Sequence, residues 1–139
     1  WIEAHPNSFP PMVINLTDAE GNDCDLWGAA AGVRSLATAH GNVLLMTIHV
    51  SSSATGKCVM FPDRLEQMLS KIARVLFEVS SELPGSLQQA AAAWGIDVRP
   101  GCRMMASDAD AVGLLRAFDF LLKLLRPRPP HPPLAAHLR

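Results

Sequence analysis

The chain has 139 residues, of which 49% are apolar, and this combination argues against a disordered chain and leaves room for one domain. Its 12 basic and 13 acidic residues give a net charge of −1, and it has no tyrosine and no apolar run of about 20 residues, so neither nucleic acid nor a membrane is an expected partner. Its three cysteines, Cys24, Cys58 and Cys102, are far apart and form no CxxC pair, which argues against a disulfide framework or a structural zinc site and favours the reducing cytoplasm. Cys58 and Cys102 have no adjacent base and are interpreted as ordinary thiols.

The first residues predict that the chain is the later part of a larger domain. Trp1 to His5 resembles the last turn of a helix, and Pro6, Pro10 and Pro11 then impose an extended backbone before the first strand. A processed or cloned N-terminus is the alternative interpretation.

The next segment has the pattern of a strand, a helix and a second strand. Met12–Leu16 is apolar with little alternation, which predicts a strand covered on both faces, and Val43–Val50 has the same character. Leu26–Ala39 between them has helical periodicity, with Gly41 beyond its end. Such a βαβ unit requires parallel strands and a right-handed crossover. The inward stripe of the helix is expected to contain Leu26, Ala29, Ala30, Val33, Leu36 and Ala37.

The second half is predicted to add three helices and one strand. A loop at 51–62 is followed by helices at Leu65–Val79 and Ser86–Trp94, a strand at Cys102–Ala106, and a helix from about Ala109 to Leu125 capped by Ser107 or Asp108. The inward residues are expected to be Leu65, Met68, Leu69, Ile72, Leu76 and Val79 in the first helix, and Val112, Leu115, Phe118, Leu122 and Leu125 in the last. The proline-rich tail at 126–139 is expected to be an extended or disordered appendage, with a ligand for a proline-binding domain as the alternative.

Together these elements predict one α/β domain over residues 1–125. The expected architecture is a three-layer, Rossmann-like, mainly parallel sheet with helices on both faces. Three strands leave an open edge, which must be covered or paired. We expect missing sequence, another chain or a second copy of this chain to occupy that edge.

Four carboxylates within eight residues follow the first predicted strand: Asp18, Glu20, Asp23 and Asp25. Open α/β sheets place charged groups for a ligand at the carboxyl ends of their strands, and crowded oxygen ligands suit Mg²⁺ or Ca²⁺. The alternative is a solvated loop that caps the following helix through Asp23 or Asp25. Asp18, nearest the strand, is the best candidate ligand, and Asp25, nearest the helix, is the best candidate cap.

Known loop motifs do not match this spacing. In an EF-hand that began at Asp18, the sixth-position glycine would be Asp23 and the twelfth-position glutamate would be Ala29. A phosphotransfer site of the haloacid-dehalogenase type would need DxDx[TV], but the order here is Asp18-Ala19-Glu20-Gly21. A Mg²⁺-dependent hydrolase or phosphotransferase using Asp18 and Asp23 therefore stays an alternative without a matching motif.

A serine loop, Ser51-Ser52-Ser53, follows His49 at the end of the second predicted strand. A serine nucleophile needs a neighbouring base and a third orienting group, and the G-x-S-x-G turn that commonly presents it is missing from the sequence. A turning and capping loop is the favoured interpretation, with Ser51 and Ser52 lining the same crevice as Asp18.

The residues around the first strand resemble the later half of bacterial von Willebrand factor type A (VWA) domains: Phe9 to Glu20, followed by Asp23 and Asp25. In that family an ITDGE-like strand end carries the third motif of the metal-ion-dependent adhesion site. Further segments follow in the family's order: Gly41–Leu45, His49–Ser53, Phe61–Asp63, Leu76–Ser81 and Leu83–Pro84. The resemblance covers about Pro6 to Leu125 and rests on the order and spacing of these pieces.

This resemblance implies a Rossmann-like sheet and a Mg²⁺ site at its carboxyl edge that recognises an acidic group on a partner protein. Only Asp18 carries over as a metal-site residue, and in the family this position often acts through water. The DxSxS and threonine loops of the family would lie before Trp1. Ala19 stands at a usual glycine and Cys24 interrupts the acidic loop, so the site is expected to be incomplete and Mg²⁺ binding weak or absent. The residues that would line the crevice are Thr17, Glu20, Asp23, Ser51 and Ser52.

The first hypothesis is therefore a non-enzymatic, cytoplasmic protein-interaction module of VWA type, with no catalytic residues and with Asp18 as its metal ligand. Its partner would be a protein, either one that presents an acidic group at the metal site or the missing half of the domain, and a homodimer is a further arrangement. The second hypothesis is the Mg²⁺-dependent hydrolase or phosphotransferase, and the third is a structural fragment with no ligand.

Overall fold

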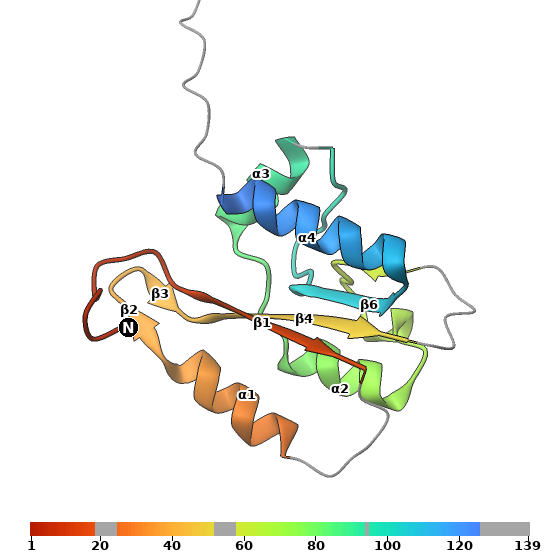
Figure 1. Cartoon of the computed structure of the whole chain (residues 1–139), viewed down its shortest axis with the longest axis horizontal. Coiled ribbons are helices and arrows are strands. Elements are labelled where there is room, and N and C mark those ends of the chain that lie inside the picture. Colours follow the sequence, from red (N-terminus) through yellow and green to blue (C-terminus); the bar gives the residue numbers. More distant parts are fainter. Residues whose placement is uncertain (19–24, 52–57, 94, 126–139) are drawn as a thin grey trace, which may run out of the picture.

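A computed structural model of the chain describes residues 1–18, 25–51, 58–93 and 95–125. Its elements are, in chain order, β1 (Met12–Thr17), α1 (Leu26–Ser35), β2 (Ala37–Thr38), β3 (Gly41–Asn42), β4 (Leu44–Val50), β5 (Val59–Met60), the 3₁₀ helix η1 (Leu65–Gln67), α2 (Lys71–Val79), α3 (Gly85–Ala93), β6 (Met105–Ala109) and α4 (Ala111–Leu125). A four-stranded sheet forms the middle layer, with α3 and α4 on one face and α1 and α2 on the other (Figure 1). The fold is the three-layer α/β, mainly parallel, Rossmann-like arrangement expected from the sequence.

The strand order in this sheet is β1-β4-β6-β5. β1 and β6 both run parallel to β4, whereas the short β5 runs antiparallel to β6. β1 pairs with β4 in unbroken register from Met12↔Leu44 to Thr17↔His49. The chain passes through α1 between these two strands, which confirms the predicted βαβ unit. Both strands therefore end at the same edge, the carboxyl edge of the sheet.

Two apolar cores lie on opposite faces of the sheet, because successive side chains of a strand point to opposite faces. The core beneath α3 and α4 includes Leu44, Met46, Ile48, Ala91, Ala117, Phe120 and Leu121. The core beneath α1 and α2 includes Ala30, Leu45, Ala73, Leu76, Phe77 and Met105. β4 contributes to both cores and all its residues except Val50 are buried, which confirms the buried strand predicted at this position.

β1 differs from the prediction, because none of its side chains is buried. Val13, Ile14 and Leu16 are 40%, 44% and 52% exposed. The apolar run predicted coverage on both faces, but β1 is an edge strand, and β4 is its only neighbour among the described strands. Apolar character alone does not report whether a strand has neighbours on both sides.

The helix after β1 is shorter than predicted. α1 ends at Ser35 instead of Ala39, because the chain turns into the hairpin formed by β2 and β3. Gly41, expected just beyond the helix, has a φ of +133° and supplies the conformation that this hairpin needs. Leu36 and Ala37, expected on the inward stripe, are consequently exposed.

The helix predicted over Leu65–Val79 is broken into η1 and α2. Ser70 lies at the break, where its Oγ accepts a hydrogen bond of 3.1 Å from the backbone N–H of Ala73 and caps α2. A serine that bonds the backbone in this way competes with a continuous helix. Leu69, expected to point inward, precedes this cap and is exposed.

The third strand also begins later than predicted. β6 covers Met105–Ala109 instead of Cys102–Ala106, because the residues before it pair with the segment that follows α2. The carbonyl of Cys102 accepts a hydrogen bond of 2.8 Å from the N–H of Leu83. β5 then pairs with β6 from within the predicted loop.

α4 buries the face opposite to the one predicted. Its exposed residues include Val112, Leu115, Phe118 and Leu122. Over 111–123, where side chains are described, its buried residues are Gly113, Ala117, Phe120 and Leu121. Both faces carry apolar side chains, so helical periodicity permits either one to face the sheet. The small residues select the observed face, since a Cβ at Gly113 would lie 2.7 Å from the Sγ of Cys58. The side chain of Leu125 and the proline-rich tail at 126–139 lie outside the described residues.

Within the described ranges, no helix has the length and the apolar character needed to cross a membrane.

Leu121→Ala is expected to lower the free energy of unfolding by about 2–5 kcal/mol, because it leaves a cavity in the core beneath α4. Leu115→Ala makes the same chemical change on the same helix, but Leu115 is 70% exposed, so a change of less than about 0.5 kcal/mol is expected. Urea unfolding followed by circular dichroism measures both values. Equal losses in the two variants would contradict the assigned face of α4.

Candidate functional site

The carboxyl edge of the sheet brings together the ends of β1 and β4. Thr17 pairs with His49, so Asp18 follows opposite Val50 and next to the position of Ser51. Asp18 is exposed, whereas Thr17 and Ser51 are half-buried. The structure therefore places Asp18, Thr17 and Ser51 at one rim, and the predicted crevice residues Glu20, Asp23 and Ser52 lie outside the described residues.

Asp25 has the role of helix cap that the sequence predicted. Its Oδ1 accepts a hydrogen bond of 2.8 Å from the N–H of Gly28 at the start of α1. Gly28 permits this contact, because a Cβ there would collide with the Asp25 carboxylate. Of the four clustered carboxylates, Asp25 is thus committed to α1, while Asp18 stays at the rim.

A β-bulge at the end of β6 adds a second group of polar residues to this edge. Ile48 pairs with Ala106 and Val50 pairs with Ala109, so Ser107 and Asp108 together face the single residue His49. Asp108 has a φ of +52°, a left-handed conformation that aspartate tolerates better than most residues. Bulges of this kind bend a strand and redirect its side chains.

The bulge brings the carboxylate of Asp108 close to the imidazole of His49. Asp108 Oδ1 lies 3.8 Å from His49 Nδ1, and the two side chains are 15% and 6% exposed. That distance permits an ion pair if His49 is protonated but is too long for a hydrogen bond, and Nδ1 has no hydrogen-bond partner among the described residues. The hydroxyl of Ser107 donates a hydrogen bond of 2.9 Å to Asp108 Oδ2 and fixes the carboxylate from the other side.

Asp110 and Cys58 lie beside this group, where α4 begins. Asp110 Oδ1 accepts a hydrogen bond of 2.7 Å from the N–H of Gly113, so Asp110 caps α4, and the prediction that Ser107 or Asp108 is the cap is wrong. Cys58 packs against Gly113. Burial is the main cause that raises the pKa of the Cys58 thiol, and the negative charge of Asp110 raises it further. The positive charge of Arg116 lowers this pKa by less, and Asp108 adds a still smaller rise.

Neither described cysteine has the low pKa of a nucleophilic thiol. Cys58 and Cys102 are both free. Burial is also the main cause of the raised pKa of Cys102. Both thiols therefore stay protonated at neutral pH, which agrees with their interpretation as ordinary thiols.

Sequence reasoning missed Asp108 as a neighbour of His49. The predicted third strand ended at Ala106, which assigned Ser107 and Asp108 to the cap of the last helix. No local pattern marks the bulge, and the contact joins residues far apart in the chain.

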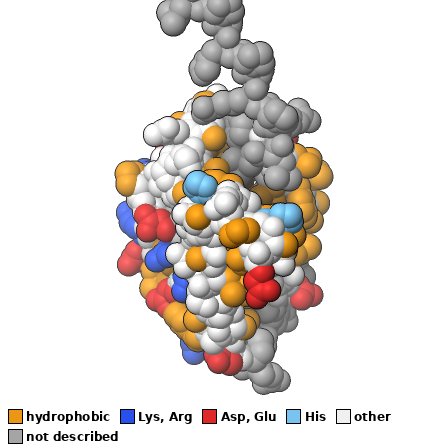
Figure 2. Space-filling view, turned by 90° about the vertical axis from the view of Figure 1, so that its left-hand side faces the viewer, with side chains coloured by type: hydrophobic (Ala, Val, Ile, Leu, Met, Phe, Trp, Pro, Cys, Tyr) orange, Lys and Arg blue, Asp and Glu red, His pale blue; other side chains and the backbone are white. Residues whose placement is uncertain are grey.

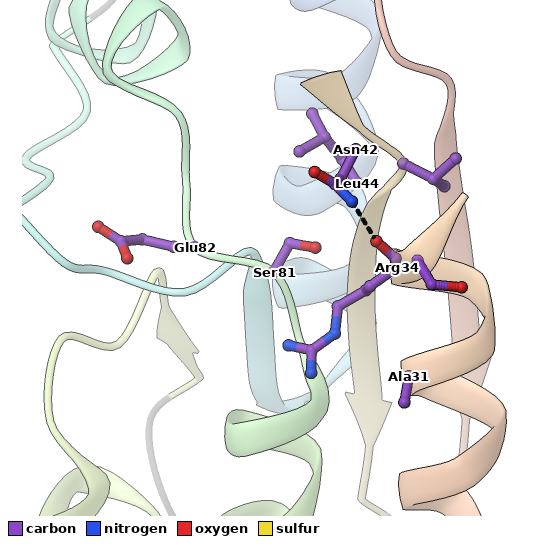
Figure 3. Close-up of a pocket in the computed structure, with 8 residues that line it drawn as sticks. Ala31, Arg34, Asn42, Leu44, Ser81 and Glu82 are labelled. Atoms are coloured by element: carbon purple, nitrogen blue, oxygen red, sulfur yellow. Dashed lines mark hydrogen bonds between the residues drawn. The ribbon is translucent and has the colours of Figure 1, made fainter. Parts of the chain in front are cut away.

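A cavity of about 430 Å³ lies at the opposite end of β4, near its first residues. Two of its polar side chains take part in structural hydrogen bonds: Asn42 Nδ2 donates to the carbonyl of Arg34 at 2.8 Å, and Ser81 Oγ accepts from the N–H of Leu45 at 2.9 Å. Figure 3 shows the Arg34 side chain directed toward Ser81, and that of Glu82 pointing away from it. These hydrogen bonds hold α1, β4 and the segment after α2 together around the cavity. The carboxyl edge is therefore the better candidate for a functional site.

Among the residues that the structure describes, no three histidine, cysteine, aspartate or glutamate side chains converge as a ready metal site. Comparison with protein-family models, with curated proteins and with solved structures found no match for this chain. The functional interpretation therefore rests on the residues at the carboxyl edge and on their geometry.

Asp110→Asn is expected to lower the pKa of Cys58, because it removes the negative charge that raises this pKa most while asparagine still caps α4. In a chain with Cys24→Ala and Cys102→Ala, the pH at which Cys58 reaches half its maximal rate of alkylation by iodoacetamide should shift down. Asp119→Asn is the matched control, since Asp119 is exposed and paired with Lys123. Identical pH profiles for Asp110→Asn and the parent chain would contradict the arrangement around Cys58.

Proposed function

We propose that this chain is a protein-interaction module of VWA type that binds its partner at the carboxyl edge of the sheet. The observation that supports this proposal is the register of β1 against β4, which delivers Asp18 to the rim beside Ser51. An exposed carboxylate at the end of a parallel strand is positioned to meet a ligand outside the sheet. The resemblance of the segment around Asp18 to the family's strand end supplies the second line of support.

Asp18 is the residue that would hold a divalent cation in this proposal. Mg²⁺ prefers octahedral oxygen coordination and retains several waters when a protein offers only one or two carboxylates. One exposed carboxylate fits such a water-rich site but not a tight one. An acidic side chain of the partner would complete the coordination, so that metal binding and partner binding would strengthen each other.

The side chains of His49 and Asp108 lie 3.8 Å apart and add polar groups to this edge. Ser107 holds Asp108, and the bulge fixes the backbone around it. In the proposed module the side chains of His49 and Asp108 determine the shape and charge of the rim, and neither acts as a nucleophile. The hydrolase or phosphotransferase alternative depends on Asp23, which lies outside the described residues, and no other observation favours it.

The proposed compartment is the cytoplasm. The widely spaced cysteines favour a reducing environment, and the two described ones, Cys58 and Cys102, are free thiols.

Calorimetric titration of the full chain with Mg²⁺ and Mn²⁺ tests the proposed cation site. The parent chain is expected to bind weakly, with a dissociation constant on the order of 10⁻³ M, and Asp18→Asn should abolish the heat of binding. Asp25→Asn is the matched control, because asparagine preserves the cap on α1. Heat that survives in Asp18→Asn would contradict the role of Asp18.

A phosphatase assay with the same proteins separates the module from the enzyme. The module should show no Mg²⁺-dependent turnover of p-nitrophenyl phosphate. Turnover that disappears in Asp18→Asn would favour the hydrolase or phosphotransferase instead.

A further inference from the structure

The outer edge of β1 carries backbone groups that no described strand bonds. The carbonyl of Pro11 accepts a hydrogen bond of 3.0 Å from the N–H of Leu44, so Pro11 faces β4. Because both backbone groups of a residue in a parallel strand point to the same side and alternate residues share that side, Met12, Ile14 and Leu16 direct theirs outward. These three residues form the outer edge.

Nothing in the sequence of β1 protects this edge against another strand. Natural edge strands are commonly protected by lysine, proline, charge or a bulge. Met12–Thr17 contains no charged residue and no proline, and its register with β4 is unbroken. Val13 on one face of the strand and Ile14 and Leu16 on the other are all exposed. Such an edge favours addition of an apolar strand.

We infer that β1 pairs in antiparallel fashion with β1 of a second copy of this chain, across a two-fold axis at Ile14. The outward residues are spaced symmetrically, so Ile14 would face Ile14 and Met12 would face Leu16 of the other copy. In an antiparallel pair, two facing residues whose N–H and C=O both point toward the partner strand exchange two hydrogen bonds. Every outward N–H and C=O of Met12, Ile14 and Leu16 would then have a partner.

Charge favours the antiparallel direction. With the axis at Ile14, Asp18 of one copy falls opposite Pro10 of the other, which is uncharged. A parallel pair in register would place the two Asp18 carboxylates side by side, where like charges destabilise pairing. The antiparallel arrangement therefore keeps the two acidic rims at opposite ends of the joined strands.

The surface beside β1 on the α1 side is hollowed and apolar. Val13 and Val33 line both of two adjoining cavities of about 250 and 570 Å³ on the α1 side, and Trp1 and Leu36, which line the larger one, are themselves exposed. Figure 2 shows hydrophobic side chains reaching the surface at several points on the side of the molecule where the N-terminal segment lies.

Single-cysteine crosslinking tests the register in the full chain carrying Cys24→Ser, Cys58→Ala and Cys102→Ala. In the proposed pair, Ile14→Cys faces itself with Cα atoms about 5.5 Å apart, within reach of a disulfide. Leu16→Cys, on the same edge and face, would lie roughly 13 Å from its counterpart, four residues along the strand. Mild oxidation should give at least about tenfold more covalent dimer with Ile14→Cys, because a disulfide spans no more than about 7 Å between Cα atoms. Equal yields would overturn the register.

Sedimentation velocity of the unmodified chain tests the pairing itself. A concentration-dependent dimer is expected, and Ile14→Pro should make the chain monomeric, because proline removes an outward N–H without breaking a bond to β4. Ile14→Lys is a second blocking variant, Ile14→Val is the control that should still dimerise, and circular dichroism verifies that each variant is folded. A monomeric unmodified chain, or a dimer indifferent to both blocking variants, would overturn the proposal. These measurements need no metal, so their outcome is independent of the cation site at Asp18.

Discussion

The placement of β4 between two neighbours is the constraint on which the rest of the structure depends. Its backbone is bonded on one side to β1 and on the other to β6, and its side chains enter both cores. Ser81 extends this constraint beyond the strands, since its N–H donates to the carbonyl of Leu45 and its carbonyl accepts from the N–H of Met104. Because β1 and β6 both run parallel to β4, the ends of all three strands lie at one edge of the sheet.

Hydrophobic and capping patterns over short stretches of the sequence predicted the parts of the fold that depend on local chemistry. The apolar run of β4, the helix that follows Asp25 and the parallel βαβ connection were all visible in the sequence. Exposure of β1 and the orientation of α4 were not, because an apolar pattern does not identify its neighbours. The contact between His49 and Asp108 was invisible for another reason, since it depends on a bulge between strands that are far apart in the chain.

The carboxyl edge therefore combines two carboxylates, those of Asp18 and Asp108, which differ in how strongly the surrounding protein restrains them. Asp18 is exposed at the end of an edge strand, where its carboxylate can bind a cation from solvent. Asp108 is held by Ser107 and faces a largely buried imidazole, so its environment is set by the protein. A buried polar group without a hydrogen-bond partner is costly, so His49 Nδ1, which has none among the described residues, gains most from the nearby Asp108 carboxylate.

The bulge in β6 also has a consequence for the helix that follows it. Successive side chains of an α-helix are about 100° apart, since there are 3.6 residues per turn, so the residue at which α4 begins affects which face meets the sheet. The extra residue opposite His49 moves Asp110, the cap of α4, one position along the chain relative to β4. The cap at Asp110 then begins α4, and the small residue Gly113 allows its face to pack closely against Cys58.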